Sequence, residues 1–279
     1  MILRWMANGR RIGAEDRPSV MGILNVTPDS FSDGGRFDTL DRALAYADRL
    51  VSDGADLIDI GGESSRPGSD PITLAEELDR VIPIVAQLVR RVDLPLSVDT
   101  SKPEVALAAI EAGASIINDI GGLADPEMLR VVSSSDVGVV IMHMRGTPRT
   151  MQMAPQYRNV VEEVIEYLTG RVVSAERAGI VRSRIAIDPG IGFGKSFDHN
   201  LQLLRELLQF EEIGCPILVG TSRKGFLGTI TGRPLDDRQA ASVASALAAS
   251  ARGASIVRVH DVAATLDALR VWSAQNGWD

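Results

Sequence analysis

Residues 20–35 read VMGILNVTPDSFSDGG, an apolar run followed by a polar, glycine-ended segment. The run at residues 20–24 is typical of a buried strand. The segment from Asn25 to Gly35 places hydrogen-bonding groups at the carboxyl end of that strand, where parallel α/β folds carry their chemistry. Taken alone, the segment could equally be a polar turn that caps the next helix. The same arrangement recurs along the chain, and this recurrence favours the functional interpretation.

Short apolar runs that end in polar or glycine residues occur eight times. They cover residues 20–26, 57–61, 96–99, 116–119, 137–144, 185–188, 217–220 and 256–260. Their ends lie about 33 residues apart on average, which is the spacing of repeated strand–helix units. The sequence therefore predicts an α/β fold with a single (β/α)8 barrel, with its site at the carboxyl ends of the strands. An open, doubly wound sheet is the alternative.

Helical patterns separate the runs. They cover residues 40–51, 72–92, 103–112, 160–178, 200–208, 238–251 and 262–273. Several of these patterns end in Gly-Ala directly before the next apolar run, as in the short loops of a barrel. We expect residues 1–19 to form an N-terminal appendage, a hairpin at the bottom of the barrel, and residues 20–279 to form the barrel domain.

Composition narrows the class of protein. The 279 residues carry a net charge of −8, and only 4% are aromatic, so Val, Ile, Leu and Ala must build the core. No run of Lys and Arg suggests a nucleic-acid track or a membrane patch. Neither a signal peptide nor an apolar run of transmembrane length is present, so we expect a cytoplasmic protein. The single cysteine, Cys215, is expected to be a buried filler and not a nucleophile.

Unusual residues collect at the predicted strand ends. Besides residues 25–35, these segments are GGESSRPG at 61–68, DTSK at 99–102, NDIGG at 118–122, MHMRGTP at 142–148, DPGIGFGK at 188–195, GTSRKG at 220–225 and RVHD at 258–261. In a barrel such ends converge, so scattered loop residues become one constellation.

Asp99, Asn118 and Asp188 end three different predicted strands. Two carboxylates and an amide in a partly dry pocket suit a flat heterocycle that bears N–H, amino and carbonyl groups. The alternative is that the aspartates cap the helices that follow them.

Basic residues at strand ends form a candidate anion site in this acidic protein. They are Arg66, Arg223, Lys224 and Arg258. Each alone could be an ordinary surface charge. His260 lies two residues after Arg258, so both can face one side of an extended segment and contact a phosphate, although a structural histidine is the alternative.

The glycine loop from Gly190 to Gly194 matches neither common phosphate motif. A P-loop would need glycine where Pro189 stands, and the dinucleotide fingerprint has a different spacing. The glycines are more consistent with close approach of the backbone to a flat ligand, with Phe193 offering a stacking face or serving as core. The other histidines, His143 and His199, are expected in the core and in a first helical turn, and no zinc motif is present.

Together, these ordered segments resemble the dihydropteroate synthase family of pterin-binding barrels, from residue 21 to residue 261. Members join 6-hydroxymethyl-7,8-dihydropterin diphosphate to 4-aminobenzoate and release diphosphate and 7,8-dihydropteroate. One departure from the family is minor: Ser65 stands where many members have threonine. The resemblance implies a Mg²⁺-assisted, dissociative substitution and a homodimer that binds small-molecule substrates, with no nucleic-acid or membrane partner.

The resemblance also implies roles for residues. The catalytic residues would be Asp99, Lys224, Asn25 and Arg258. The pterin would contact Asp99, Asn118, Met142, Asp188, Phe193, Gly220 and Lys224. The diphosphate would contact Asn25, Ser65, Arg66, Arg258 and His260, with Asn25 as the Mg²⁺ ligand. The aminobenzoate would contact Phe31, Ser65, Arg66, Pro67, Ser222 and Lys224.

Two other functions are compatible with such a barrel. A pterin-dependent methyltransferase would share the Asp and Asn residues at the pterin edge, but the Ser222-Arg223-Lys224 run, Arg66 and Arg258 argue against it. A non-catalytic paralogue would bind pterin diphosphate without releasing diphosphate. Because no key polar group is missing from the motifs, we expect an active enzyme.

Overall fold

Eight parallel strands close into a barrel in the computed structural model, which describes residues 5–26, 36–66 and 68–276. The barrel strands are β3 (Ser19–Asn25), β4 (Leu57–Gly61), β5 (Leu96–Asp99), β6 (Ile116–Asp119), β7 (Gly138–Met142), β8 (Ile185–Asp188), β9 (Ile217–Val219) and β10 (Ala254–Val259). Because β10 pairs with both β9 and β3, the sheet has no free edge. The predicted barrel is confirmed, and the open-sheet alternative is wrong.

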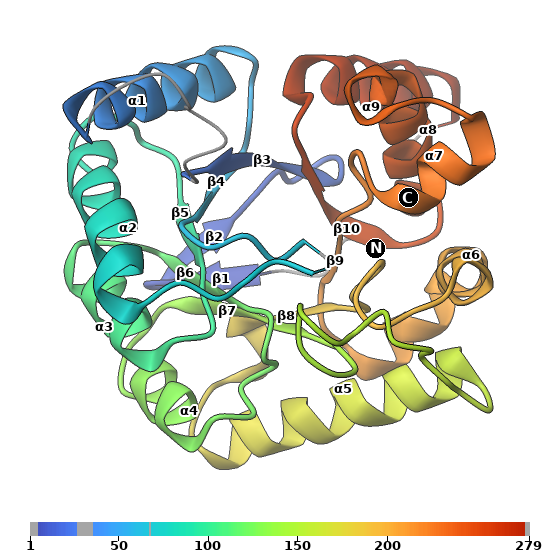
Figure 1. The fold of residues 1–279 in the computed structure, drawn as a ribbon, viewed down its shortest axis with the longest axis horizontal. Helices are drawn as coiled ribbons and strands as arrows, with labels where there is room; N and C mark the ends of the chain where they lie inside the picture. The colour runs from blue at the N-terminus through green and yellow to red at the C-terminus, as the bar shows by residue number, and fades with distance from the viewer. Residues whose placement is uncertain (1–4, 27–35, 67, 277–279) are drawn as a thin grey trace.

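The helices form an outer ring around the strands (Figure 1). They are α1 (Arg36–Ser52), α2 (Leu74–Leu88), α3 (Pro103–Glu111), α4 (Pro126–Ser133), α5 (Val160–Arg177), α6 (Phe197–Arg205), α7 (Gly225–Thr231), α8 (Gln239–Ser250) and α9 (Val262–Asn276). Short 3-10 helices, η2 (Arg182–Arg184), η3 (Leu207–Ile213) and η4 (Leu235–Asp237), complete the connections. Helices α4 and α7 were not expected from the sequence, and the helical pattern at residues 200–208 runs from α6 into η3. Across the described residues, no helix has the length and apolar character needed to cross a bilayer.

An antiparallel hairpin precedes the barrel, made of β1 (Trp5–Ala7) and β2 (Arg10–Ile12). Its buried side chains pack with residues near the starts of the barrel strands. This cluster contains Trp5, Ala7, Ile12, Met21, Leu57, Ile116, Val140, Ala186, Leu218 and Ile256. The Trp5 indole N–H donates to the carbonyl of Arg184, just before β8 (3.0 Å). The hairpin therefore packs beneath the barrel, and the carboxyl ends of the strands stay available for a site.

Candidate active site

Strand register aligns the predicted polar residues in one row. Asn25 pairs with Gly61, Gly61 with Asp99, and Asp99 with Asn118, across β3 to β6. A Cβ atom added to Gly61 would lie 3.6 Å from Asn25 Oδ1 and 3.9 Å from Asp99 Oδ2. The missing side chain at Gly61 thus leaves the space that these two polar groups border. On the other side of the barrel, Met142 pairs with Asp188.

A buried carboxylate that the sequence analysis missed lies at the centre of the site. Asp59 in β4 is fully buried and accepts hydrogen bonds from Arg258 Nε (2.6 Å), Ser97 Oγ (2.6 Å) and Asn118 Nδ2 (3.2 Å). Burying a carboxylate is costly unless charge and hydrogen bonds compensate, and Asp59 has both. The signal in the sequence was an aspartate inside the apolar run LIDIG at residues 57–61.

Arg258 links Asp59 to the end of β5. One of its terminal nitrogens donates to Asp99 Oδ2 at 3.0 Å while its Nε is bonded to Asp59. Burial nevertheless raises the pKa of Asp99 to about 7, because desolvation outweighs the attraction of Arg258, and the negative charge of Asp59 adds to the rise. Asp99 therefore titrates near neutral pH, which is the range a catalytic carboxylate needs.

Lys224 faces the cluster from the opposite side of the barrel. Its Nζ lies 4.6 Å from the centre of the Phe193 ring and donates to the Ile191 carbonyl. Burial lowers the pKa of Lys224 to about 8, against the attraction of Asp188. Added Cβ atoms at Gly192 and Gly220 would lie 3.2 Å from Lys224 Cδ and 3.9 Å from its Nζ, so both glycines border this side chain.

Asp188 ends β8 below the glycine loop. Its Oδ1 accepts a hydrogen bond from the Gly190 amide at 2.7 Å, and burial raises the pKa of its carboxyl. This bond is to a turn residue, whereas the following helix α6 is capped by Ser196, and the N-cap position of α3 is Lys102 and not Asp99. The alternative that the aspartates cap the following helices is therefore wrong, and the electrostatic contact of Asp188 with Lys224 agrees with the site.

Ser222 and His260 form a pair beside this cluster. Ser222 Oγ lies 3.0 Å from His260 Nδ1, and the His260 amide donates to the same oxygen (3.2 Å). Burial, aided by Arg223 and Arg258, lowers the pKa of His260 to about 3, so the ring is neutral. A neutral imidazole can contact an anion only as an N–H donor.

The four predicted anion-binding cations differ in their environments. Arg223 pairs with Asp261 (2.9 Å), Arg258 pairs with Asp59 and Asp99, and Lys224 bonds a carbonyl. Arg66 is exposed, and its charge contributes to the low pKa of His260, so it lies near that end of the site. Ser65 next to it is half-buried. Phe31 and Pro67 lie outside the described residues.

Other expectations from the sequence are confirmed. Cys215 is fully buried, and burial raises the pKa of its thiol to about 11. His143 is buried against Tyr157 and Tyr167. His199 lies in the first turn of α6, where it completes a capping box with Ser196.

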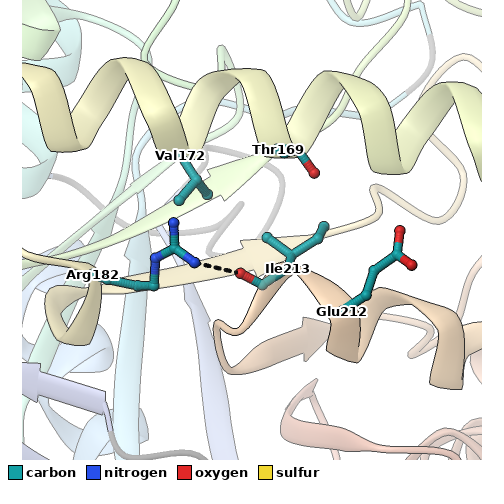
Figure 2. Close-up of a pocket in the computed structure, with 5 residues that line it drawn as sticks. All are labelled: Thr169, Val172, Arg182, Glu212 and Ile213. Atoms are coloured by element: carbon teal, nitrogen blue, oxygen red, sulfur yellow. Dashed lines mark hydrogen bonds between the residues drawn. The ribbon is translucent and has the colours of Figure 1, made fainter.

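A cavity of about 330 Å³ lies apart from this cluster (Figure 2). It is lined by Thr169, Val172, Arg182, Glu212 and Ile213. Arg182 donates to the Ile213 carbonyl at 3.1 Å across it. Arg182 and Ile213 precede β8 and β9, so the cavity is on the side of the strand starts, away from the predicted site residues.

Comparison with known proteins identifies the family. A family model described as pterin binding enzyme matches residues 21–260. Dihydropteroate synthase from Haemophilus influenzae is 48% identical over 257 residues, which cover 92% of this chain and 94% of the relative. The chain belongs to the dihydropteroate synthase family.

Solved structures agree with this assignment. The Xanthomonas albilineans enzyme with 4-aminobenzoic acid superposes with a TM-score of 0.93 at 51% identity, covering 100% of both chains. The same organism's enzyme in complex with 7,8-dihydropteroate has a TM-score of 0.89 at 49% identity, covering 99% of this chain and 100% of that one. The fold is thus that of solved dihydropteroate synthases.

Proposed function

We propose that this enzyme joins 6-hydroxymethyl-7,8-dihydropterin diphosphate to 4-aminobenzoate and releases diphosphate, as a cytoplasmic step of folate biosynthesis. The observation that carries the proposal is the row of polar groups at the ends of β3, β5 and β6, facing Asp188 and Lys224. Carboxylates accept from the ring N–H and amino groups of a pterin, and an ammonium donates to its ring acceptors. Asp99, Asn118, Asp188 and Lys224 are the groups for this edge, and Met142, Phe193 and Gly220 border the ring.

The charges of the cluster suit a dissociative substitution. The bond between the pterin methylene and the diphosphate oxygen breaks first, and its electron pair leaves with the diphosphate. The positive charge that remains on the methylene is shared with the ring. Asp59 and Asp99 carry two negative charges against one on Arg258, so the cluster favours a cation nearby once Asp99 is ionised. The amine nitrogen of aminobenzoate then bonds to the methylene and loses a proton.

Mg²⁺ fits the end of β3 as a partner of the leaving diphosphate. Asn25 offers a hard carboxamide oxygen directed at the space beside Gly61, and Mg²⁺ prefers one or two protein oxygens together with phosphate oxygens and water. Among the described residues there is no cluster of three His, Cys, Asp or Glu side chains that could hold a metal without the substrate. When bound, the ion would neutralise charge on the diphosphate. Ser65, Arg66, Arg258 and His260 are the proposed protein contacts of that group, with Ser222 nearer the aminobenzoate.

The test is the release of diphosphate from 6-hydroxymethyl-7,8-dihydropterin diphosphate by the purified protein with Mg²⁺, measured with and without 4-aminobenzoate. Release that depends on aminobenzoate, together with dihydropteroate formation, is the expected result. Tight pterin binding without turnover would establish the non-catalytic paralogue instead. Methyl transfer from methyltetrahydrofolate to a corrinoid acceptor would establish the methyltransferase.

The dissociative step has its own test. Deuterium on the pterin methylene should give a normal secondary isotope effect on kcat/KM, because the carbon becomes trigonal before the amine attacks. An isotope effect of unity, or a covalent enzyme–pterin adduct that is competent to form product, would contradict the mechanism. The homodimer remains a prediction, and light scattering of the purified enzyme tests it.

A further inference from the structure

Lys195 is a buried lysine that the mechanism above does not use. It follows the glycine loop and is 2% exposed, although lysine normally keeps its amine in water. Its Nζ lies 2.8 Å from His143 Nδ1, 3.2 Å from the His143 carbonyl oxygen and 3.0 Å from the Phe193 carbonyl oxygen. These three contacts account for the hydrogen-bonding capacity of the amine.

The contacts hold in either charge state of Lys195. An ammonium donates three hydrogen bonds, to the two carbonyls and to Nδ1 of a neutral imidazole. A neutral amine donates two and accepts one from a His143 ring protonated at Nδ1. Burial lowers the pKa of Lys195 well below its usual value and lowers the pKa of His143 to about 3. A group satisfied in this way is suited to hold two segments together and not to react.

The two segments are the residue after β7 and the loop 189–195. Gly190 has a φ of +70°, and a Cβ atom there would lie 1.9 Å from the His143 carbonyl oxygen, the same oxygen that Lys195 bonds. The loop is also tied at Gly192, whose amide donates to Asn200 Oδ1 (2.6 Å). Lys195 thus fixes the end of a loop whose start and middle are fixed by other bonds.

This loop supports Lys224 on the side of the pterin groups. Phe193 lies under the Lys224 ammonium at 4.6 Å, and the Ile191 carbonyl accepts its hydrogen bond. Lys195 bonds the carbonyl of Phe193 itself. A shift of the loop would therefore move both supports of Lys224 together.

We propose that Lys195 is a positioning residue for pterin binding: it ties the loop 189–195 to His143 and so sets the Phe193 ring and the Ile191 carbonyl against Lys224. The proposal rests on the proposed function, since it concerns the pterin part of that site. Lys195 does not itself contact a substrate. Its effect passes through Phe193, which is assigned to the pterin alone, and through Lys224, which is assigned to both substrates, so binding of the pterin should be affected more than binding of the aminobenzoate.

The decisive variant is Lys195→Met, which keeps an unbranched side chain only one heavy atom shorter and removes all three bonds. The expected result is a rise of about tenfold in the KM for dihydropterin diphosphate and in its Kd measured by calorimetry, the size that loss of one hydrogen-bonded support gives. The KM for 4-aminobenzoate, which shares only Lys224 with this path, should rise less than the KM for dihydropterin diphosphate. In a double-mutant cycle with Phe193→Leu, the two effects on Kd should be less than additive, because both act through the same loop.

Arg184→Met is the matched control. Arg184 is also a long buried cation, 8% exposed, that donates to backbone carbonyls, those of Val137 (2.8 Å) and Val132 (3.1 Å). It precedes β8 at the opposite end of the same strand. Its substitution should lower the melting temperature and leave both KM values unchanged. If Lys195→Met behaves in the same way, Lys195 has only a structural role and the proposal is overturned.

A milder variant decides the case in which Lys195→Met does not fold. His143→Leu removes one of the three contacts and leaves both carbonyls, so a rise of about threefold in the KM for dihydropterin diphosphate is expected. Unchanged KM values for this variant would overturn the proposal. Failure of the proposed function is distinguishable from failure of this proposal. The first would appear as absent turnover in the wild type, and the Kd for dihydropterin diphosphate would still report whether Lys195 positions the loop.

Discussion

Asp59→Asn isolates the charge of the buried carboxylate at the centre of the site. An asparagine of the same shape can accept from Arg258 and Asn118 with its oxygen, and its amide can donate to Ser97 Oγ. All three hydrogen bonds that Asp59 makes are then kept, and one negative charge is removed. The substitution therefore tests electrostatics without opening a cavity.

The expected consequence is a lower pKa of Asp99. The charge of Asp59 raises that pKa, and both carboxylates contact the same guanidinium. Two like charges about 4–5 Å apart interact by about 3–4 kcal/mol at an effective dielectric constant of about 20. At about 1.4 kcal/mol per pKa unit, this sets an upper limit of about 2–3 units, and screening by Arg258 reduces the expected shift to about 1 unit. In the variant Arg258 has Asp99 as its only charged partner, and its stronger attraction also lowers the pKa of Asp99.

The assay is the pH dependence of kcat/KM for dihydropterin diphosphate. The wild type and the variant are compared, so that the ionisation of the substrate affects both equally. Because the proposed mechanism requires ionised Asp99, wild-type activity should fall as the pH drops below about 7. In Asp59→Asn this acid limb should lie about 1 unit lower. Asp59→Ala is the contrasting variant, since it removes the acceptor of Arg258 Nε, Ser97 and Asn118 and leaves Arg258 paired with Asp99 alone, and it should cost about 3 kcal/mol of stability. An acid limb that stays in place or moves upward in Asp59→Asn would refute the coupling.

Four further outcomes are expected. Asp99→Asn should reduce kcat/KM by about 10²-fold or more yet unfold at a higher temperature than wild type at pH 8. The sign follows from the raised pKa of Asp99: between about pH 4 and pH 7 the native state binds a proton that the unfolded state does not. Wild type therefore loses stability as the pH rises through that window, and the variant does not. An equal difference in melting temperature at pH 5 and pH 8 would contradict this. Gly190→Ala should lower the free energy of unfolding in urea by about 3 kcal/mol, because of the positive φ of Gly190 and the close His143 carbonyl. A variant as stable as wild type would show that the loop can shift freely. Chelation with EDTA should abolish turnover, and added Mg²⁺ should restore it, with little change in the melting temperature of the free protein; turnover in excess EDTA would exclude the metal. Iodoacetamide at pH 7.5 should leave native Cys215 unlabelled, because the thiol is buried and the pKa raised to about 11; mass spectrometry showing rapid labelling would contradict the burial.

The strands were predictable because parallel barrel strands are buried on both faces and read as continuous apolar runs. The runs at 57–61, 96–99, 116–119 and 185–188 coincide with β4, β5, β6 and β8. Residues at the carboxyl ends of such runs could be assigned to one end of the barrel without knowing any contact, and this grouped Asp99, Asn118 and Asp188 in one predicted pocket.

The two helices that were missed have different physical reasons. In α7, Gly225 and Gly228 lower the helix propensity of a seven-residue segment, so tertiary packing must stabilise it. In α4 the signal was present: Asp125 caps the helix by accepting from the Glu127 amide, and Pro126 occupies the first turn. The buried apolar positions of α4, Met128, Val131 and Val132, do follow a helical period, but the helix has only eight residues, which is shorter than the window in which such a period can be recognised.

Pairing among charged groups could not be predicted, and it changes the interpretation of the site. Arg258 and Asp59 are 199 residues apart, and only closure of β10 onto β3, which in turn pairs with β4, brings them together. From the sequence, Arg258 was one of four cations available to an anion. In the structure its guanidinium is already held by two carboxylates, so the proposed contact with diphosphate would have to share Arg258 with Asp59 and Asp99. A guanidinium shared with diphosphate would neutralise Asp99 less, and under the proposed mechanism the negative charge of Asp99 would then act more fully on the cation that forms as the bond to diphosphate breaks.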